Sequence, residues 1–149
     1  MNSQKGFTLL ELLIAGTLFM VFVIQIGSLW TSMDKHIGYI ADRIVVAREA
    51  RTARALLLGD LAGSASVTLG VSEVMTVHYT GPGVPDVTYS NSAGSLLRTD
   101  AGANWSLPAA RYLESASYTL EGDGSLRASL SFRKGQAQTT LNVFMDLPG

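Results

Sequence analysis

The stretch Lys5-Gly-Phe-Thr-Leu-Leu-Glu-Leu-Leu13 places one carboxylate, Glu11, in a run from Phe7 to Leu29 that carries no other charge. At about 1.5 Å per residue, a helix of this length crosses a hydrocarbon core of about 30 Å. An acid at the centre of a membrane helix costs roughly 2.5 to 3.5 kcal/mol, and less near an end. We therefore expect Glu11 to have a function and a positively charged partner.

A positive charge becomes available if the chain is cut between Gly6 and Phe7. The new α-amino group is mostly protonated at neutral pH and lies one helical turn from Glu11. In a single chain the two charges can meet through water or lipid headgroups. In a stack of identical helices, the amine of one subunit can pair with Glu11 of its neighbour. This spacing suggests assembly.

The segment Gly6-Phe-Thr-Leu-Leu-Glu-Leu12 resembles the processing signal of type IV pilins and type II secretion pseudopilins. In that family a dedicated prepilin peptidase cuts after the glycine and methylates the new N-terminal phenylalanine. The resemblance implies that Gly6 and Phe7 are the processing residues and that Glu11 is the carboxylate used in assembly. Many major pilins also have a proline later in this helix, where this chain has Gly27-Ser28.

The resemblance also implies a domain organisation. Residues 1–6 would be a leader peptide, residues 7–30 a transmembrane and filament-core helix, and residues 31–149 an amphipathic continuation of that helix followed by a globular antiparallel sheet. The expected partners are other pilin or pseudopilin subunits, the prepilin peptidase, an inner-membrane assembly platform, and membrane lipid before assembly. Lys5 precedes the apolar run, so we expect a cytoplasmic N-terminus, a periplasmic C-terminal domain and later incorporation into a pilus or pseudopilus.

Composition limits what the remaining residues can do. The chain has 149 residues, so a membrane helix leaves about a hundred for one modest core. It has no cysteine, which excludes disulfides, thiolate zinc sites and thiol catalysis. A formal net charge of −1 gives no general attraction to nucleic acid. No nucleophile elbow, P-loop, dinucleotide fingerprint or HExxH motif occurs, so we expect a protein that is not an enzyme and needs no cofactor.

Helical periodicity continues beyond the apolar run. Apolar residues recur every three or four positions, and most charged residues lie off this stripe. The stripe consists of Ile37, Ile40, Ile44, Ala47, Ala50, Ala53, Leu57 and Leu61. Gly59 and Gly63 mark its expected end near Leu61. Gly27-Ser28 is a possible point of local unwinding, since glycine weakens a helix by about 1 kcal/mol relative to alanine.

After Gly63 the chain shows the alternation and turn signals of an antiparallel meander. The expected strands are 74–79, 87–89, 96–98, 116–120, 126–133 and 138–145, with a loop at 81–85 and turns at 91–94, 122–124 and 134–135. One face of this sheet is apolar and needs a cover, which the stripe on the preceding helix can supply. The sequence therefore predicts an α+β fold, a long N-terminal helix packed on an antiparallel sheet, as in pilins.

Two metal hypotheses are weaker than their structural alternatives. His36 and His78 have no acid at ligand spacing, so we interpret them as surface or core histidines. Glu121-Gly-Asp-Gly124 has two acids that could hold calcium weakly. It supplies too few oxygens for an EF-hand-like site, so we interpret it as a hairpin turn.

Arg43, Arg48, Arg51 and Arg54 form a basic tract on the predicted helix. DNA binding is one reading of this tract. Nearby acids and the overall charge favour a solvated helix face or salt bridges between subunits. Trp105 fits either a loop anchor or an exposed contact, and the sequence does not separate the two.

Within the family, the segments 87–89, 95–99 and 116–120 look like the distal part of J-type minor pseudopilins and related minor pilins. We therefore expect a minor subunit, and the choice among type IV pilus, type II secretion and competence systems stays open. Two readings from other classes also stay open. One is a signal-anchored periplasmic binding domain with an uncut Gly6-Phe7 bond, and the other is a DNA- or ligand-binding module carried on a pilin helix.

Overall fold

A computed structural model describes residues 8–71, 73–102 and 106–147 of the chain. Gly6, Phe7 and Trp105, which the sequence analysis singled out, lie outside the described residues. The chain divides into two compact units, one ending at Gly38 and the other beginning at Tyr39.

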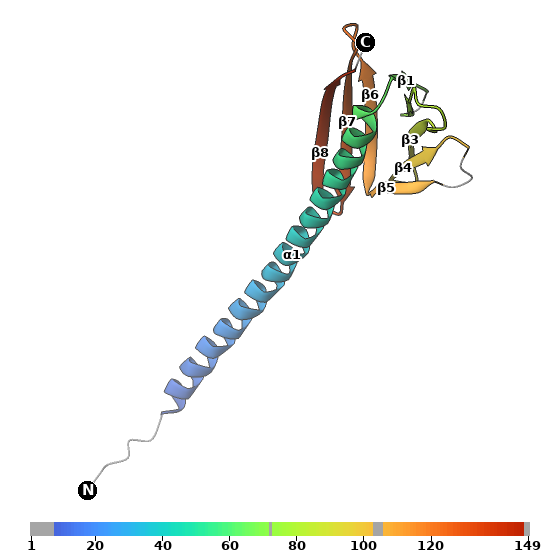
Figure 1. The fold of residues 1–149 in the computed structure, drawn as a ribbon. Coiled ribbons are helices and arrows are strands. Elements are labelled where there is room, and N and C mark those ends of the chain that lie inside the picture. Colours follow the sequence, from blue (N-terminus) through green and yellow to red (C-terminus); the bar gives the residue numbers. More distant parts are fainter. Residues whose placement is uncertain (1–7, 72, 103–105, 148–149) are drawn as a thin grey trace. The chain divides into compact units, whose positions relative to one another are not determined.

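One long helix, α1 (Leu9–Ala62), accounts for all the helical residues that the structure describes (Figure 1). It stays helical through Gly27 and Ser28, the point considered for unwinding. The Ser28 hydroxyl donates to the Gln25 carbonyl at 2.9 Å, and the Thr31 hydroxyl donates to the Ser28 carbonyl at 2.9 Å. The small and polar residues at this point are therefore accommodated by hydrogen bonds to the preceding turn.

The strands after α1 form two antiparallel sheets rather than the single sheet predicted. They are β1 (Ser66–Leu69), β2 (Met75–His78), β3 (Val87–Ser92), β4 (Ser95–Asp100), β5 (Leu107–Arg111), β6 (Leu113–Leu120), β7 (Ser125–Lys134) and β8 (Ala137–Asp146). The order is β1-β2-β3-β4-β5 in the first sheet and β6-β7-β8 in the second. Every strand pairs only with its sequence neighbours, as in a meander.

Tyr112 is the residue at which the chain passes from one sheet to the other. It lies between β5 and β6 with φ 62°, in the left-handed region that residues other than glycine rarely adopt. Its carbonyl accepts a bond from the Arg133 backbone at 2.8 Å, and the next amide, that of Leu113, donates to the Gly94 carbonyl at 2.9 Å. This reversal directs β6 to β7, so β5 and β6 do not pair.

We call α1 up to Gly38 its first part and α1 from Tyr39 to Ala62 its second part. The second part and the strands together form the strand-rich part of the chain, and its core lies between this stretch of helix and the apolar faces of the strands. The helix buries Val46, Ala50, Ala53, Leu57 and Leu61. The largest fully buried strand residues include Tyr89, Phe132, Met75, Leu96, Leu126 and Leu130. Full burial of one such side chain contributes about 1.5 to 3 kcal/mol. The predicted packing of helix on sheet is therefore confirmed.

The prediction that the whole apolar stripe packs on the sheet was wrong for its first three members. Ile37, Ile40 and Ile44 are all more than half exposed, whereas Val46, which the stripe omitted, is buried. Successive helix residues are rotated by about 100°, so Ile44 and Val46, two residues apart, point to nearly opposite sides of the helix. The predicted stripe drifts around the helix, and only its later members share the buried face.

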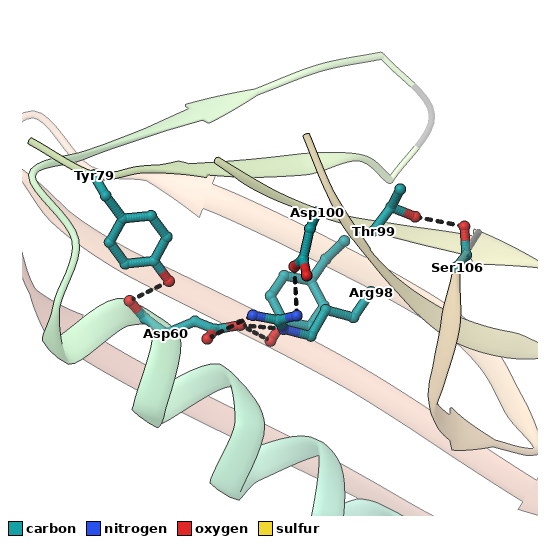
Figure 2. Close-up of polar contacts among 7 residues, drawn as sticks. Asp60, Tyr79, Arg98, Thr99, Asp100 and Ser106 are labelled. Atoms are coloured by element: carbon teal, nitrogen blue, oxygen red, sulfur yellow. Dashed lines mark hydrogen bonds and ion pairs between the residues drawn. The ribbon is translucent and has the colours of Figure 1, made fainter. Parts of the chain in front are cut away.

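A polar cluster fixes the end of α1 to the five-stranded sheet (Figure 2). The Asp60 carboxylate accepts bonds from Arg98 Nε at 2.8 Å and from the Tyr89 hydroxyl at 2.6 Å, and its carbonyl accepts one from the Tyr79 hydroxyl at 3.1 Å. Arg98 also pairs with Asp100. Burial disfavours the charged form of Asp60, but the bonds from Arg98 and Tyr89 outweigh burial and lower the pKa of this carboxyl. Burial, together with Asp60, raises the pKa of Tyr79 to about 12.

Candidate functional site

Glu11 and Thr8 form a reciprocal set of hydrogen bonds at the start of α1. The Thr8 amide and the Thr8 hydroxyl each donate to Glu11 Oε2 at 2.9 Å, and the Glu11 amide donates to the Thr8 hydroxyl at 3.3 Å. Because α1 begins at Leu9, Thr8 is the N-cap and Glu11 is the third helical residue. This is a capping box, which satisfies backbone donors that a helix start otherwise leaves unpaired.

The capping box gives Glu11 a partner within its own chain. Sequence reasoning considered only a cationic partner, although the spacing Thr-x-x-Glu before an apolar run is the known signal for this motif. Both bonds to the carboxylate fall on Oε2, and within the described residues none falls on Oε1. The residue before the N-cap is Phe7, so an amine created by cleavage there would lie one residue from Thr8 in the sequence.

The helix around Glu11 presents apolar side chains to its surroundings. Every described residue from Thr8 to Gly38 is exposed, including leucines, phenylalanines and isoleucines. By length and composition this helix can cross a membrane. Gly16 leaves a shallow apolar notch on it, lined by Leu13, Thr17, Met20 and Val21. A surface of this size needs lipid or other helices to cover it.

The first 24 residues match the family model of the prokaryotic N-terminal methylation motif. The chain carries the signature of type IV pilins and pseudopilins. This signature is typical of pilin-like substrates of prepilin peptidase. It implies assembly with other pilin subunits. Together with the apolar helix, it fits a membrane-anchored pilin.

The pilin signature covers 24 of the 149 residues, and all the strands lie outside it. No curated protein and no solved structure matches the chain.

His78 has polar neighbours on both sides of its ring. Its Nδ1 lies 2.7 Å from Asp86 Oδ2, and its Nε2 lies 2.8 Å from the Thr68 hydroxyl. The bond from His78 lowers the pKa of Asp86. His36 is exposed on α1. Across the described ranges no three histidine or acidic side chains come close enough to hold a metal ion. His78 thus joins β2 to β1 and to the residue before β3.

The segment from Glu121 to Gly124 forms the turn between β6 and β7. The Gly124 amide donates to the Glu121 carbonyl at 3.0 Å, and Asp123 Oδ1 accepts bonds from the amide and hydroxyl of Ser125. Glu121 also pairs with Arg127 at 3.1 Å. Both acids therefore have protein partners in the hairpin that the sequence predicted.

The charged residues on the second part of α1 fall into two groups. Its acids contact the strands. Asp42 pairs with Lys134 at 3.0 Å, and Glu49 accepts a hydrogen bond from the Arg111 amide at 2.8 Å. Asp60 pairs with Arg98. Its arginines are exposed, and none forms an ion pair with a described residue. These arginines are Arg43, Arg48, Arg51 and Arg54. From Tyr39 onward, the acids of α1 therefore contact the strands, and its arginines face solvent.

Proposed function

We propose that this protein is a structural subunit of a type IV pilus or a type II secretion pseudopilus. The supporting observation is the pilin signature at the start of a helix whose described residues up to Gly38 are all exposed and mostly apolar. In this proposal the chain is cut after Gly6 and Phe7 is methylated. The helix then anchors the subunit in the inner membrane, with the strand-rich part in the periplasm, until it enters the filament.

The proposal divides the chain as follows. Residues 1–6 are the leader, residues 7–30 form the membrane and filament-core segment, and residues 31–149 form the remaining helix and the two sheets. Unit 2, from Tyr39, buries its own core, so the part after the membrane segment has what it needs to fold independently.

We further propose a minor rather than a major subunit. Support comes from the resemblance of segments 87–89, 95–99 and 116–120 to J-type minor subunits, and these segments fall in β3, β4 and β6. Neighbouring genes for an assembly ATPase, a prepilin peptidase or further pilin-like leaders would identify the system. A full set of secretion genes would place the protein in a pseudopilus.

Glu11 would act in assembly through its charge. During assembly the amine of Phe7 on one subunit would pair with Glu11 of the neighbour and neutralise an acid that otherwise faces lipid. The capping box holds the Glu11 carboxylate at the helix start before that partner arrives. The assembly role and the capping role make different demands on this side chain, so substitutions can separate them.

The test is the amount of each variant recovered in sheared filaments. Glu11→Gln keeps a capping box, because glutamine serves at this position, but removes the charge. Thr8→Val removes the cap and keeps the charge. We expect Glu11→Gln and Glu11→Ala to lose most incorporation, while Thr8→Val keeps most of it and all three variants are processed normally. Wild-type incorporation of Glu11→Gln would show that pairing between subunits is wrong and that the residue serves the cap.

A further inference from the structure

The outer edge of β8 is a long strand edge without the usual protection. β8 pairs with β7 through ten consecutive partners and lies at one end of the three-stranded sheet (Figure 1). Natural edge strands are blunted by prolines, lysines, bulges or covering segments. β8 contains no proline or lysine, its register with β7 is unbroken, and Asp146 is its only charge.

The backbone of β8 has capacity for further hydrogen bonds. In an antiparallel pair, about half of a strand's amide and carbonyl groups point away from the partner. Among the described residues, no backbone hydrogen bond outside the β7 ladder reaches β8. The Phe144 side chain, on the outer face of this strand, is 58% exposed. An added strand would complete these backbone bonds and cover part of that ring.

Two arginines stand beside this edge. A groove of about 230 Å³ lies between the second part of α1 and β8. Its lining is Ala47, Ala50, Arg51, Arg54, Thr139, Thr140 and Leu141. Arg51 and Arg54 are exposed and form no ion pair with any residue the structure describes. A strand added to β8 would thus have guanidinium groups beside the side chains that it turns toward α1.

We propose that the β8 edge binds an extended segment of another protein, with acidic side chains at alternating positions, as a fourth strand of this sheet. The segment's backbone would pair with β8, and its carboxylates would reach Arg51 and Arg54, since charge-assisted arginine–carboxylate bonds are the strong class. Its other face would carry apolar or β-branched residues beside Phe144.

A second copy of this chain fits the groove poorly. No strand in the described part of the chain carries acids at alternating positions. If two β8 strands paired with each other, they would contribute only Asp146, which ends the strand. The charge pattern therefore favours a different protein, and this inference goes beyond the proposed assembly through the first part of α1.

The test uses the full chain in nonionic detergent micelles. The probe is a fluorescein-labelled peptide of eight residues that alternates valine and glutamate, and binding is measured by fluorescence anisotropy. Arg51→Glu combined with Arg54→Glu should weaken binding at least tenfold. Arg48→Glu is the matched control, because Arg48 is exposed on the same helix but is not part of the groove lining. It should change the affinity less than twofold.

Peptide chemistry tests strand addition without altering the protein. N-methylation of every second amide removes the donors along one edge of the peptide. One of the two methylation registers should weaken binding at least tenfold, and the other should have little effect. Replacing the glutamates by lysines should abolish binding. Thermal melts of each variant by circular dichroism should match the wild type, since the substituted side chains are exposed.

Several results would overturn the proposal. These are no binding to the wild-type chain, an equal loss with Arg48→Glu, or no effect of either methylation register. Self-association that is lost with the double arginine variant would assign the edge to a second copy instead. Binding of a single-stranded oligonucleotide that the peptide cannot displace would assign the arginines to phosphate groups.

Discussion

Both parts of α1 carry apolar side chains, but only the second part is covered by its own chain. From Tyr39 onward the helix buries Val46, Ala50, Ala53, Leu57 and Leu61 against strands of its own chain. Up to Gly38 every described residue is exposed, although this part is the more apolar one. Apolar composition therefore indicates that a surface must be covered, but whether its own chain covers it depends on which other apolar faces that chain supplies.

The charges follow the same division. In the second part, Asp42, Glu49 and Asp60 have partners on the strands. In the first part, the Glu11 carboxylate accepts hydrogen bonds only from Thr8 among the described residues. The strand-rich part buries its own apolar core, whereas the first part of α1 needs lipid or other helices to cover it.

The largest expected effect comes from one charge placed in each region. Leu130 is fully buried, so Leu130→Asp should unfold the strand-rich part, because an unpaired buried charge costs several kcal/mol against a stability of about 5 to 15 kcal/mol. Leu18 is 66% exposed, so Leu18→Asp should leave the melting temperature unchanged and impair membrane insertion, at a cost of roughly 2.5 to 3.5 kcal/mol. Melting curves and membrane fractionation measure the two effects. A normal melt for Leu130→Asp would mean that this sheet face is not buried.

A smaller effect is expected at the junction of α1 with the five-stranded sheet. Asp60→Asn should lower the free energy of unfolding by about 1 to 3 kcal/mol, because it weakens charged hydrogen bonds from Arg98. The pKa of Asp60 is lowered in the folded state, so its contribution is complete above the unfolded pKa of about 3.9. It is lost as the pH falls below that value toward the folded pKa.

Denaturant titrations at neutral and acid pH test this sign. The difference between wild type and Asp60→Asn should be largest near pH 7 and should shrink below about pH 4. A difference that stays constant down to pH 2 would show that the charge of Asp60 does not stabilise the junction.

The smallest effect compares two glycines of α1. A methyl group added at Gly59 or at Gly27 would meet open space, so each substitution removes only the helix penalty of glycine, about 1 kcal/mol. Gly59→Ala should raise the melting temperature of the strand-rich part by a few degrees, since this part of α1 unfolds with it. Gly27→Ala should not move that transition. Equal shifts would show that both parts of the helix unfold together.

Much of this division could be predicted from the sequence. Alternation and turn residues placed the six predicted strands at β2, β3, β4, β6, β7 and β8, with bounds correct to within a few residues. β1 and β5 were missed. β1 alternates polar and apolar residues but has only four of them, too few to give a clear signal. β5 contains Pro108, which argues against a central strand but is tolerated on an edge strand such as β5.

The remaining differences depend on tertiary geometry. The left-handed Tyr112 separates the sheets, and no local pattern marks a tyrosine for that conformation. The Asp60 cluster joins residues 38 positions apart, so spacing could not show it. At the candidate site, the Thr8–Glu11 capping box could have been predicted from the spacing Thr-x-x-Glu. The sequence analysis instead predicted a cationic partner, because an acid in an apolar run is costly in a membrane.

We propose that the first part of α1 belongs to a processed and assembling pilin subunit. The most direct measurement is the intact mass of the protein purified from a host with prepilin peptidase and from the same host without it. We expect a mature chain that begins with methylated Phe7 in the first host and an uncut chain in the second, with Gly6→Val uncut in both. A chain that keeps residues 1–6 in the competent host would show that the protein is not processed as a pilin and would identify α1 as a simple membrane anchor.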